Sequence, residues 1–266
     1  MNIIVCIKQV PDTMDVKINP DTNTLVREGI HNIINPFDLY AIEEALRLKE
    51  KFGGRVSVIS LGPPQSINAL KEAVGMGADV AIQLSDRAFA GSDSWATSYT
   101  LALAIKKIGE FDIILCGKQA IDGDTGQVGP GLASQLGITQ LTYVFKIIRL
   151  DPEAGAIAVE RLLEEGREIV EARLPVLLTV VKDINQPRRP TLSHIRRASK
   201  LLIPTWTAAD LPGADPSRLG LKGSPTQVIK IFSPPKRMGV LDLITADNIE
   251  QSATILADKI IVEKIL

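Results

Sequence analysis

A glycine-rich stretch in the middle of the chain carries residue types that bind phosphate. It runs from Gly117 to Pro130 and reads GKQAIDGDTGQVGP. Glycines let a backbone approach a ligand closely, and the free N–H groups at the start of a helix attract phosphate. Thr125 and Gln127 could add hydrogen bonds to phosphate or ribose oxygens. The alternative is a plain connection in which Asp124 caps the following helix.

A second polar segment, Asn35-Pro36-Phe37-Asp38, precedes a run that contains Glu43 and Glu44. The side chain of Asn35 could bind the edge of an adenine or a ribose. An ordinary helix start, with Pro36 and Asp38 in their usual places, explains the segment equally well. A charged stretch at 159–170, followed by apolar residues at 174–179, indicates a hairpin leading to a buried strand and requires no chemistry.

Several kinds of site are disfavoured by what the chain lacks. Its two cysteines, Cys6 and Cys116, form no CxxC pair, and it has two histidines, so a zinc or iron–sulfur site is not expected. No GxGxxG follows the first predicted strand, and neither GxxxxGK[ST] nor GxSxG occurs. The absence of a self-contained catalytic group favours chemistry carried by a bound cofactor.

The composition is that of an ordinary globular protein. Of the 266 residues, 45% are hydrophobic and 23% charged, and the net charge is −1. This balance gives no general attraction to nucleic acid or to an anionic membrane. No apolar run approaches the roughly 20 residues of a transmembrane helix. The first residues show no basic segment leading into a cleavable apolar stretch, so we expect a cytoplasmic protein.

Short apolar runs alternate with amphipathic stretches through the first half of the chain. This alternation predicts βαβ units and a doubly wound, mostly parallel α/β sheet of the Rossmann-like, adenine nucleotide α hydrolase-like kind. The predicted strands are 2–8, 55–61, 79–84 and 111–116, and the predicted helices are 38–52, 65–74, 94–108 and 126–136. Ligands of such sheets bind beyond the carboxyl ends of the strands, which draws attention to residues 8–11, 35–38, 61–64 and 117–128.

The pattern changes after residue 138. Strand-like runs at 141–149, 156–163, 167–174 and 176–182, with turn signals at Asp151-Pro152 and Glu165-Gly166, predict hairpins added to the sheet. Residues 183–240 show little periodicity, and 246–264 show a helical one. We therefore expect a nucleotide-binding domain over 1–200, followed by an arm and helix over 201–266 that pack on a partner chain.

These motifs together resemble electron-transfer flavoprotein β subunits. The opening VCIKQVPD from Val5, the NPF from Asn35 with EEALRLK from Glu43, and the GKQAID from Gly117 match three landmarks of that family in order. A fourth is the stretch that contains Glu168 and the LPVLLT from Leu174. The resemblance extends from residue 1 to about residue 200.

The resemblance implies a heterodimer with an α subunit that carries FAD. In simple members the β subunit holds AMP, and in electron-bifurcating members it holds a second FAD that exchanges hydride with NADH. The DGDTGQVGP sequence from Asp122 is similar to the bifurcating pattern, as are residues 91–99 and 223–228. Gly123 and Gly126 leave room for a larger cofactor, so we expect FAD here, with AMP as the alternative.

The positions that match the family's pocket are predicted to bind the cofactor. They are Cys6, Lys8, Asn35, Pro36, Phe37, Asp38, Leu61, Gly62, Gly117, Lys118, Gln119, Ala120, Ile121, Asp122, Gly123, Asp124, Thr125, Gly126, Gln127 and Val128. The flavin itself would carry the chemistry, and Cys6 would fill space and not act as a redox thiol.

Residues 180–202 resemble the loop by which simple members bind acyl-CoA dehydrogenases. Leu192 matches the anchoring leucine, and the surrounding basic residues are Arg188, Arg189, Arg196 and Arg197. The other partners that the resemblance implies are ferredoxin or flavodoxin and a quinone-linked acceptor. Two alternatives stay open: a simple carrier with AMP, and a nucleotide-binding regulatory protein without a redox role.

Overall fold

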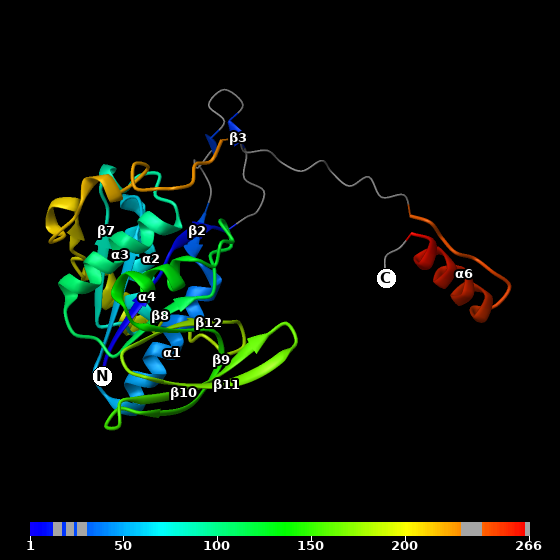
Figure 1. Cartoon of the computed structure of the whole chain (residues 1–266), viewed down its shortest axis with the longest axis horizontal. Coiled ribbons are helices and arrows are strands. Elements are labelled where there is room, and N and C mark those ends of the chain that lie inside the picture. Colours follow the sequence, from blue (N-terminus) through cyan, green and yellow to red (C-terminus); the bar gives the residue numbers. More distant parts are fainter. Residues whose placement is uncertain (13–17, 20–23, 26–30, 230–240, 264–266) are drawn as a thin grey trace. The chain divides into compact units, whose positions relative to one another are not determined.

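The computed structural model describes residues 1–12, 18–19, 24–25, 31–229 and 241–263 (Figure 1). The strands are β1 Asn2–Cys6, β2 Gln9–Pro11, β3 Ile18–Asn19, β4 Thr24–Leu25, β5 Asn32–Ile34, β6 Arg55–Leu61, β7 Val80–Leu84, β8 Ile113–Gly117, β9 Thr139–Asp151, β10 Ala156–Leu163, β11 Gly166–Arg173, β12 Val176–Val180 and β13 Thr205–Trp206. The α-helices are α1 Pro36–Phe52, α2 Ile67–Met76, α3 Ser94–Ile108, α4 Val128–Leu136, α5 Leu192–Lys200 and α6 Ile249–Val262.

The central element is a nine-stranded sheet with the order β11-β10-β9-β12-β8-β1-β6-β7-β13. From β9 to β13 in this order neighbouring strands pair in parallel, whereas β10 pairs antiparallel with both β9 and β11. The strand order reverses direction between β1 and β8, as in a doubly wound fold. The predicted α/β class with a mostly parallel sheet is therefore confirmed.

Helices cover both faces of the sheet because its central strands are apolar on both sides. In β1, Ile3 and Val5 belong to the hydrophobic core beneath α1 and α2, whereas Ile4 and Cys6 belong to the core beneath α3 and α4. Each of these side chains is almost completely buried. The uninterrupted apolar run that predicted this strand is thus divided between two cores.

The predicted hairpins extend the sheet beyond β12. β9, β10 and β11 form an antiparallel extension that projects from the parallel part (Figure 1). The turns fall where Asp151-Pro152 and Glu165-Gly166 predicted them. Val159 and Ile157 of β10 point into the core that also contains α1, which anchors the extension.

Residues 183–229 differ from the irregular arm that we expected. They contain α5, β13 and two 3₁₀ turns, Ala208–Asp210 and Pro216–Arg218. Leu211 and Leu219 are buried in the core beneath α3, and β13 pairs with β7 at the edge of the sheet. This segment therefore packs on its own chain.

The chain divides into a unit of residues 1–229 and a unit of residues 230–266. This division lies later than the expected boundary at residue 200, because Leu211 and Leu219 fix the intervening segment to the first unit. The predicted terminal helix is α6, and residue 264 lies outside the described residues. In the described part of the chain no helix is long and apolar enough to cross a membrane.

Candidate nucleotide site

The predicted pocket residues lie at the carboxyl ends of the adjacent strands β1 and β8. This is the edge where ligands of doubly wound sheets bind, at the point where the strand order reverses. Lys8 follows β1, Gly117 ends β8, and the first turn of α1 lies beside both. The structure thus brings together three segments that are far apart in the sequence.

Asp38 in this first turn joins the two strand ends. Its Oδ2 atom accepts a hydrogen bond from the backbone N–H of Lys8 (2.7 Å), and its Oδ1 accepts one from the backbone N–H of Gly117 (3.1 Å). Only 6% of the residue is exposed. Burial raises the pKa of Asp38 to about 7, against the lowering effect of the hydrogen bonds from Lys8, Asn35 and Gly117.

Asn35, at the N-cap of α1, holds the loop that follows β8. Its Nδ2 atom donates to the carbonyl oxygen of Gln119 (2.9 Å), and its Oδ1 accepts from the backbone N–H of Ile121 (3.1 Å). The residue is 1% exposed. Its amide is therefore engaged by the loop backbone as well as by Asp38.

The loop over residues 117–127 makes further contacts, both within itself and with Lys8 and Phe37. Lys8 forms an ion pair with Asp122 (2.7 Å), and Gln119 donates a hydrogen bond to Asp124. The Nζ atom of Lys118 lies 5.2 Å from the centre of the Phe37 ring. The positive φ of Asp124, 53°, marks a left-handed backbone at the tip.

The start of α4 leaves donors available for an anion. Gln127 occupies the N-cap without capping the helix through its side chain, so the first N–H groups of α4 have no side-chain acceptor. The Gln127 Oε1 atom accepts from the Ser94 hydroxyl (2.7 Å). Among the described residues, Thr125 makes no hydrogen bond. The arrangement of donors suits a phosphate group.

Two stretches noted in the sequence, residues 91–99 and 223–228, meet beside this loop. Asp93 caps α3 through Oδ1, which accepts from the N–H groups of Trp95 and Ala96, and its Oδ2 accepts from the N–H (3.0 Å) and hydroxyl (2.8 Å) of Thr226. The backbone N–H of Asp93 donates to the Ser224 hydroxyl (2.8 Å). Ser94, Asp93 and Thr226 are thus connected to Gln127, which reasoning from the sequence did not anticipate.

The remaining predicted residues lie around this centre. Cys6 and Cys116 are register partners on β1 and β8, and a hydrogen bond of the protonated Cys6 thiol with Cys116, together with burial, raises the pKa of Cys6. A neutral, buried thiol agrees with a space-filling role. Leu61 and Gly62 lie at the end of β6, next to β1 in the sheet, and in the described part of the chain neither forms a hydrogen bond or ion pair with the 117–127 loop.

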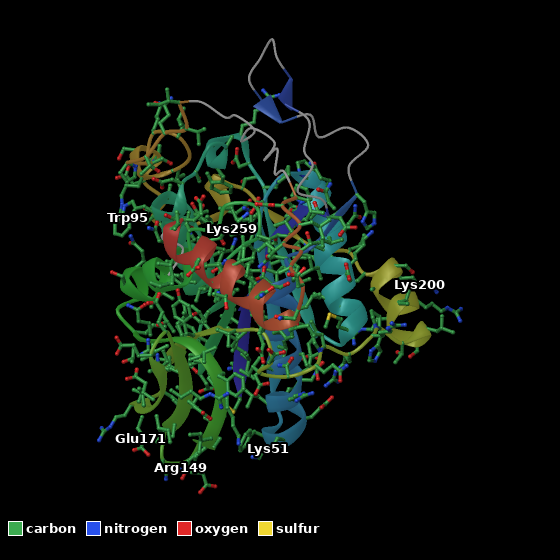
Figure 2. The ribbon with its side chains drawn as sticks, turned by 90° about the vertical axis from the view of Figure 1, so that its right-hand side faces the viewer. Lys51, Trp95, Arg149, Glu171, Lys200 and Lys259 are labelled. Carbon is green, nitrogen blue, oxygen red and sulfur yellow. The ribbon has the colours of Figure 1, made fainter. Side chains whose placement is uncertain are left out.

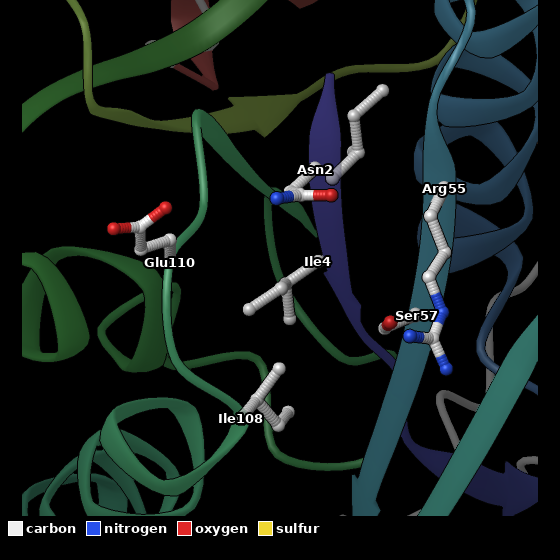
Figure 3. A pocket seen from close by; sticks show the side chains of 7 residues that line it. Asn2, Ile4, Arg55, Ser57, Ile108 and Glu110 are labelled. Carbon is white, nitrogen blue, oxygen red and sulfur yellow. The ribbon is translucent and has the colours of Figure 1, made fainter.

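Two cavities of the described residues lie elsewhere, and neither is lined by a predicted cofactor-binding residue. One of about 260 Å³ lies at the amino ends of β1 and β6, and Figure 3 shows Asn2, Ile4 and Arg55 around it. Another of about 400 Å³ lies between the β2–β5 hairpin and the start of α2, beyond the carboxyl ends of the strands. The first is at the edge where this fold does not bind ligands. The described residues contain no metal-binding group of three or more acidic, histidine or cysteine side chains.

The predicted docking residues lie on and before α5. Leu192 is its first residue and is 87% exposed, and Arg189, Arg196 and Arg197 are exposed as well. Arg188 instead binds α1, with Nε 2.8 Å from Glu43 and Nη1 2.5 Å from Glu50. Figure 2 shows Lys200 of α5 and Trp95 of α3 on opposite sides of the first unit.

The fold and the candidate site define a doubly wound α/β protein in which α1, the end of β1 and the loop after β8 meet at the carboxyl edge of the sheet. A profile of the electron transfer flavoprotein domain matches residues 22–211. The chain belongs to the electron transfer flavoprotein family.

Similar proteins cover nearly the whole chain. The electron transfer flavoprotein subunit beta of Thermoanaerobacterium thermosaccharolyticum is 50% identical over 262 residues, 98% of both chains. That of Megasphaera elsdenii is 48% identical over 274 residues, covering both chains completely. Protein FixA of Bradyrhizobium diazoefficiens is 47% identical over 264 residues, 98% of this chain and 91% of its own.

Proposed function

We propose that this chain is the small subunit of a bifurcating electron-transfer flavoprotein, with FAD in the pocket at the ends of β1 and β8. It would work with an α subunit that carries a second FAD. The electrons of NADH would be divided between ferredoxin or flavodoxin and, through the α subunit, an acyl-CoA dehydrogenase or quinone-linked acceptor. Membership of the family and the similarity to named β subunits support this proposal.

The open space at Gly123 is the observation that favours FAD over AMP. A Cβ atom added at this glycine would meet nothing within 4 Å, and one added at Gly126 would meet only the carbonyl oxygen of Lys118, at 3.5 Å. A larger cofactor can therefore approach the loop backbone here. The phosphate donors by themselves would suit either nucleotide, so a simple carrier with AMP is the second candidate.

The residues of this chain would bind and orient the cofactor. The start of α4, Thr125 and Gln127 would donate hydrogen bonds to the diphosphate, and Lys8 and Lys118 would add positive charge. The flavin, when bound, supplies acceptance of a hydride and release of single electrons. The protein would set the environment in which it does so.

Two surfaces would contact partners. The exposed Leu192 at the start of α5, with basic side chains nearby, would bind a dehydrogenase with an acidic surface. On α6, which has no buried residue, Ile249, Ile255, Leu256, Ile261 and Val262 are exposed. Such a helix is expected to pack on the α subunit.

Reduction by NADH tests the proposal directly. In the heterodimer purified with its α subunit, anaerobic addition of NADH should bleach flavin absorbance. The variant Gly123→Asp should lose the flavin of this subunit through bulk and repulsion of the diphosphate, whereas Gly123→Ala should retain most of it. A wild type that is inert to NADH, or Gly123→Asp with full flavin content, would contradict the assignment of FAD.

A further inference from the structure

We propose that Asn35 and Asp38 are positioning residues that hold the cofactor pocket in its binding shape through hydrogen bonds to the backbone on both sides of it. The proposal rests on the function proposed above. It changes the role expected for Asn35, which was direct binding of an adenine or ribose edge. The polar atoms of both side chains are already engaged by the protein.

The contacts of the two side chains have a common pattern. Asn35 bonds to a carbonyl oxygen and an N–H of the loop, at Gln119 and Ile121. Asp38 bonds to an N–H at each of two strand ends, at Lys8 and Gly117. All four partners are backbone groups, so Asn35 and Asp38 themselves occupy no side chain of the loop, and Thr125 remains available to a ligand.

Packing around Asp38 leaves little freedom for another arrangement. A Cβ atom added at Gly117 would collide with Asp38 Oδ1 and lie 2.7 Å from two atoms of Phe37. The close approach of β8 to α1 therefore depends on a glycine. A buried polar group that loses its partner is costly, so loss of either side chain should release the loop.

Ionisation of Asp38 should affect the pocket as well. A protonated carboxyl group accepts hydrogen bonds less well, so one of its two backbone contacts should weaken as the pH falls through about 7. The charged or titratable groups facing it are Lys8, paired with Asp122, and the thiols of Cys6 and Cys116 on β1 and β8. Because the folded pKa lies above the ordinary value of 3.8, the same proton stabilises the fold. A fall in FAD affinity at lower pH would therefore not be caused by unfolding that results from protonation of Asp38.

The test uses the heterodimer stripped of nucleotide and titrated with FAD. We expect Asn35→Ala and Asp38→Asn to raise the Kd for FAD at least tenfold. The control Asn185→Ala removes hydrogen bonds to the Tyr40 carbonyl and to Glu44, which lie on α1 away from the pocket, and should leave the Kd within twofold. Wild-type affinity should fall between pH 8 and pH 6, whereas that of Asp38→Asn should be low and flat. FAD is the suitable probe because the phosphate of AMP itself titrates at about pH 6.

Hydrogen exchange without nucleotide separates positioning from direct contact. In Asn35→Ala the amides of residues 117–121 should exchange at least tenfold faster than in wild type, while those of β6 and β7 should not change. Unchanged exchange in 117–121, or an equal loss of affinity in Asn185→Ala, would overturn the proposal. If the wild-type pocket binds neither FAD nor AMP, the proposed function fails, and the exchange measurement still decides whether these residues position the loop.

Discussion

The loops that follow the adjacent strands β8 and β12 are both fixed to α1, but by different parts of the chain. The loop after β8 is held through its backbone, which Asn35 and Asp38 contact at Gln119, Ile121 and Gly117. The loop after β12 is held mainly through its own side chains, with one backbone contact, from the N–H of Arg188 to Glu43. Asn185 bonds to Glu44, and Arg188 bonds to Glu43 and Glu50.

This difference decides what each loop can offer to another molecule. A loop held by its backbone can keep a side chain such as Thr125 free for a ligand. A loop held by its side chains has used them, and Arg188 is the example: it was expected at a docking surface and instead fixes the loop to α1. The predicted docking residues that remain exposed then begin at Arg189. One helix, α1, thus contacts both the loop after β8 and the loop that leads to α5.

The largest effect should come from Gly117→Ala. The added Cβ would collide with Asp38 Oδ1 and with the carbonyl carbon and Cβ of Phe37. Because these Phe37 atoms belong to the backbone or are attached directly to it, they cannot move aside. The loss in the free energy of unfolding should therefore reach or exceed the upper end of the range of about 1–3 kcal/mol for overpacking. We expect a clear fall in melting temperature together with loss of bound nucleotide. Gly123→Ala, where nothing lies within 4 Å of the added Cβ, is the matched control. Equal destabilisation of the two variants would refute the claim that close packing of α1 on β8 at Gly117 is required.

Arg188→Ala should have the next largest effect, a loss of stability. Glu43 is buried, and although burial alone would raise its pKa, the hydrogen bonds from Arg188 and Arg47 outweigh this and lower it. Removing Arg188 leaves the carboxylate with Arg47 alone, and the lost hydrogen bonds to a charged group should cost about 1.5–3 kcal/mol in the free energy of unfolding. Chemical denaturation should detect this loss, while nucleotide content stays normal. A fall in nucleotide content as large as that of Asn35→Ala would remove the distinction between the two loops.

Thr125→Val and Gln127→Ala should weaken nucleotide retention without weakening the fold. Each removes an expected hydrogen bond to a charged phosphate or to a ribose, worth about 1.5–3 kcal/mol. Equilibrium dialysis against FAD would measure the loss, and the flavin of the α subunit serves as an internal reference. Full retention in both variants would exclude these side chains as ligands.

Leu192→Ala should have no effect on stability, because this side chain is exposed. If it anchors a dehydrogenase, the substitution should cost about 1–3 kcal/mol in association, or roughly ten- to hundredfold. Electron delivery measured at limiting dehydrogenase is the appropriate assay. Arg188→Ala tests the same helix indirectly, and an unchanged rate for Leu192→Ala would move the docking surface elsewhere.

Much of the fold could be predicted from the sequence, because apolar runs separated by glycines define buried strands and their helices. α3 was predicted with its observed limits, and both hairpin turns were predicted correctly. α5 was missed because its nine residues, LSHIRRASK, are mostly polar and Ala198 is the only one of them that is buried. The sequence also placed the loop at 117–128 correctly at a strand end. The engagement of Asn35 by Gln119 and Ile121 could not be predicted, because these partners are 84 and 86 residues away along the chain.

The central claim, that this pocket holds FAD, is tested most directly by counting nucleotides. The heterodimer purified with its α subunit should be denatured, and the released nucleotides separated by chromatography and quantified against protein. The account predicts two FAD molecules per heterodimer and no AMP. One FAD and one AMP would contradict it and would identify the chain as the subunit of a simple carrier.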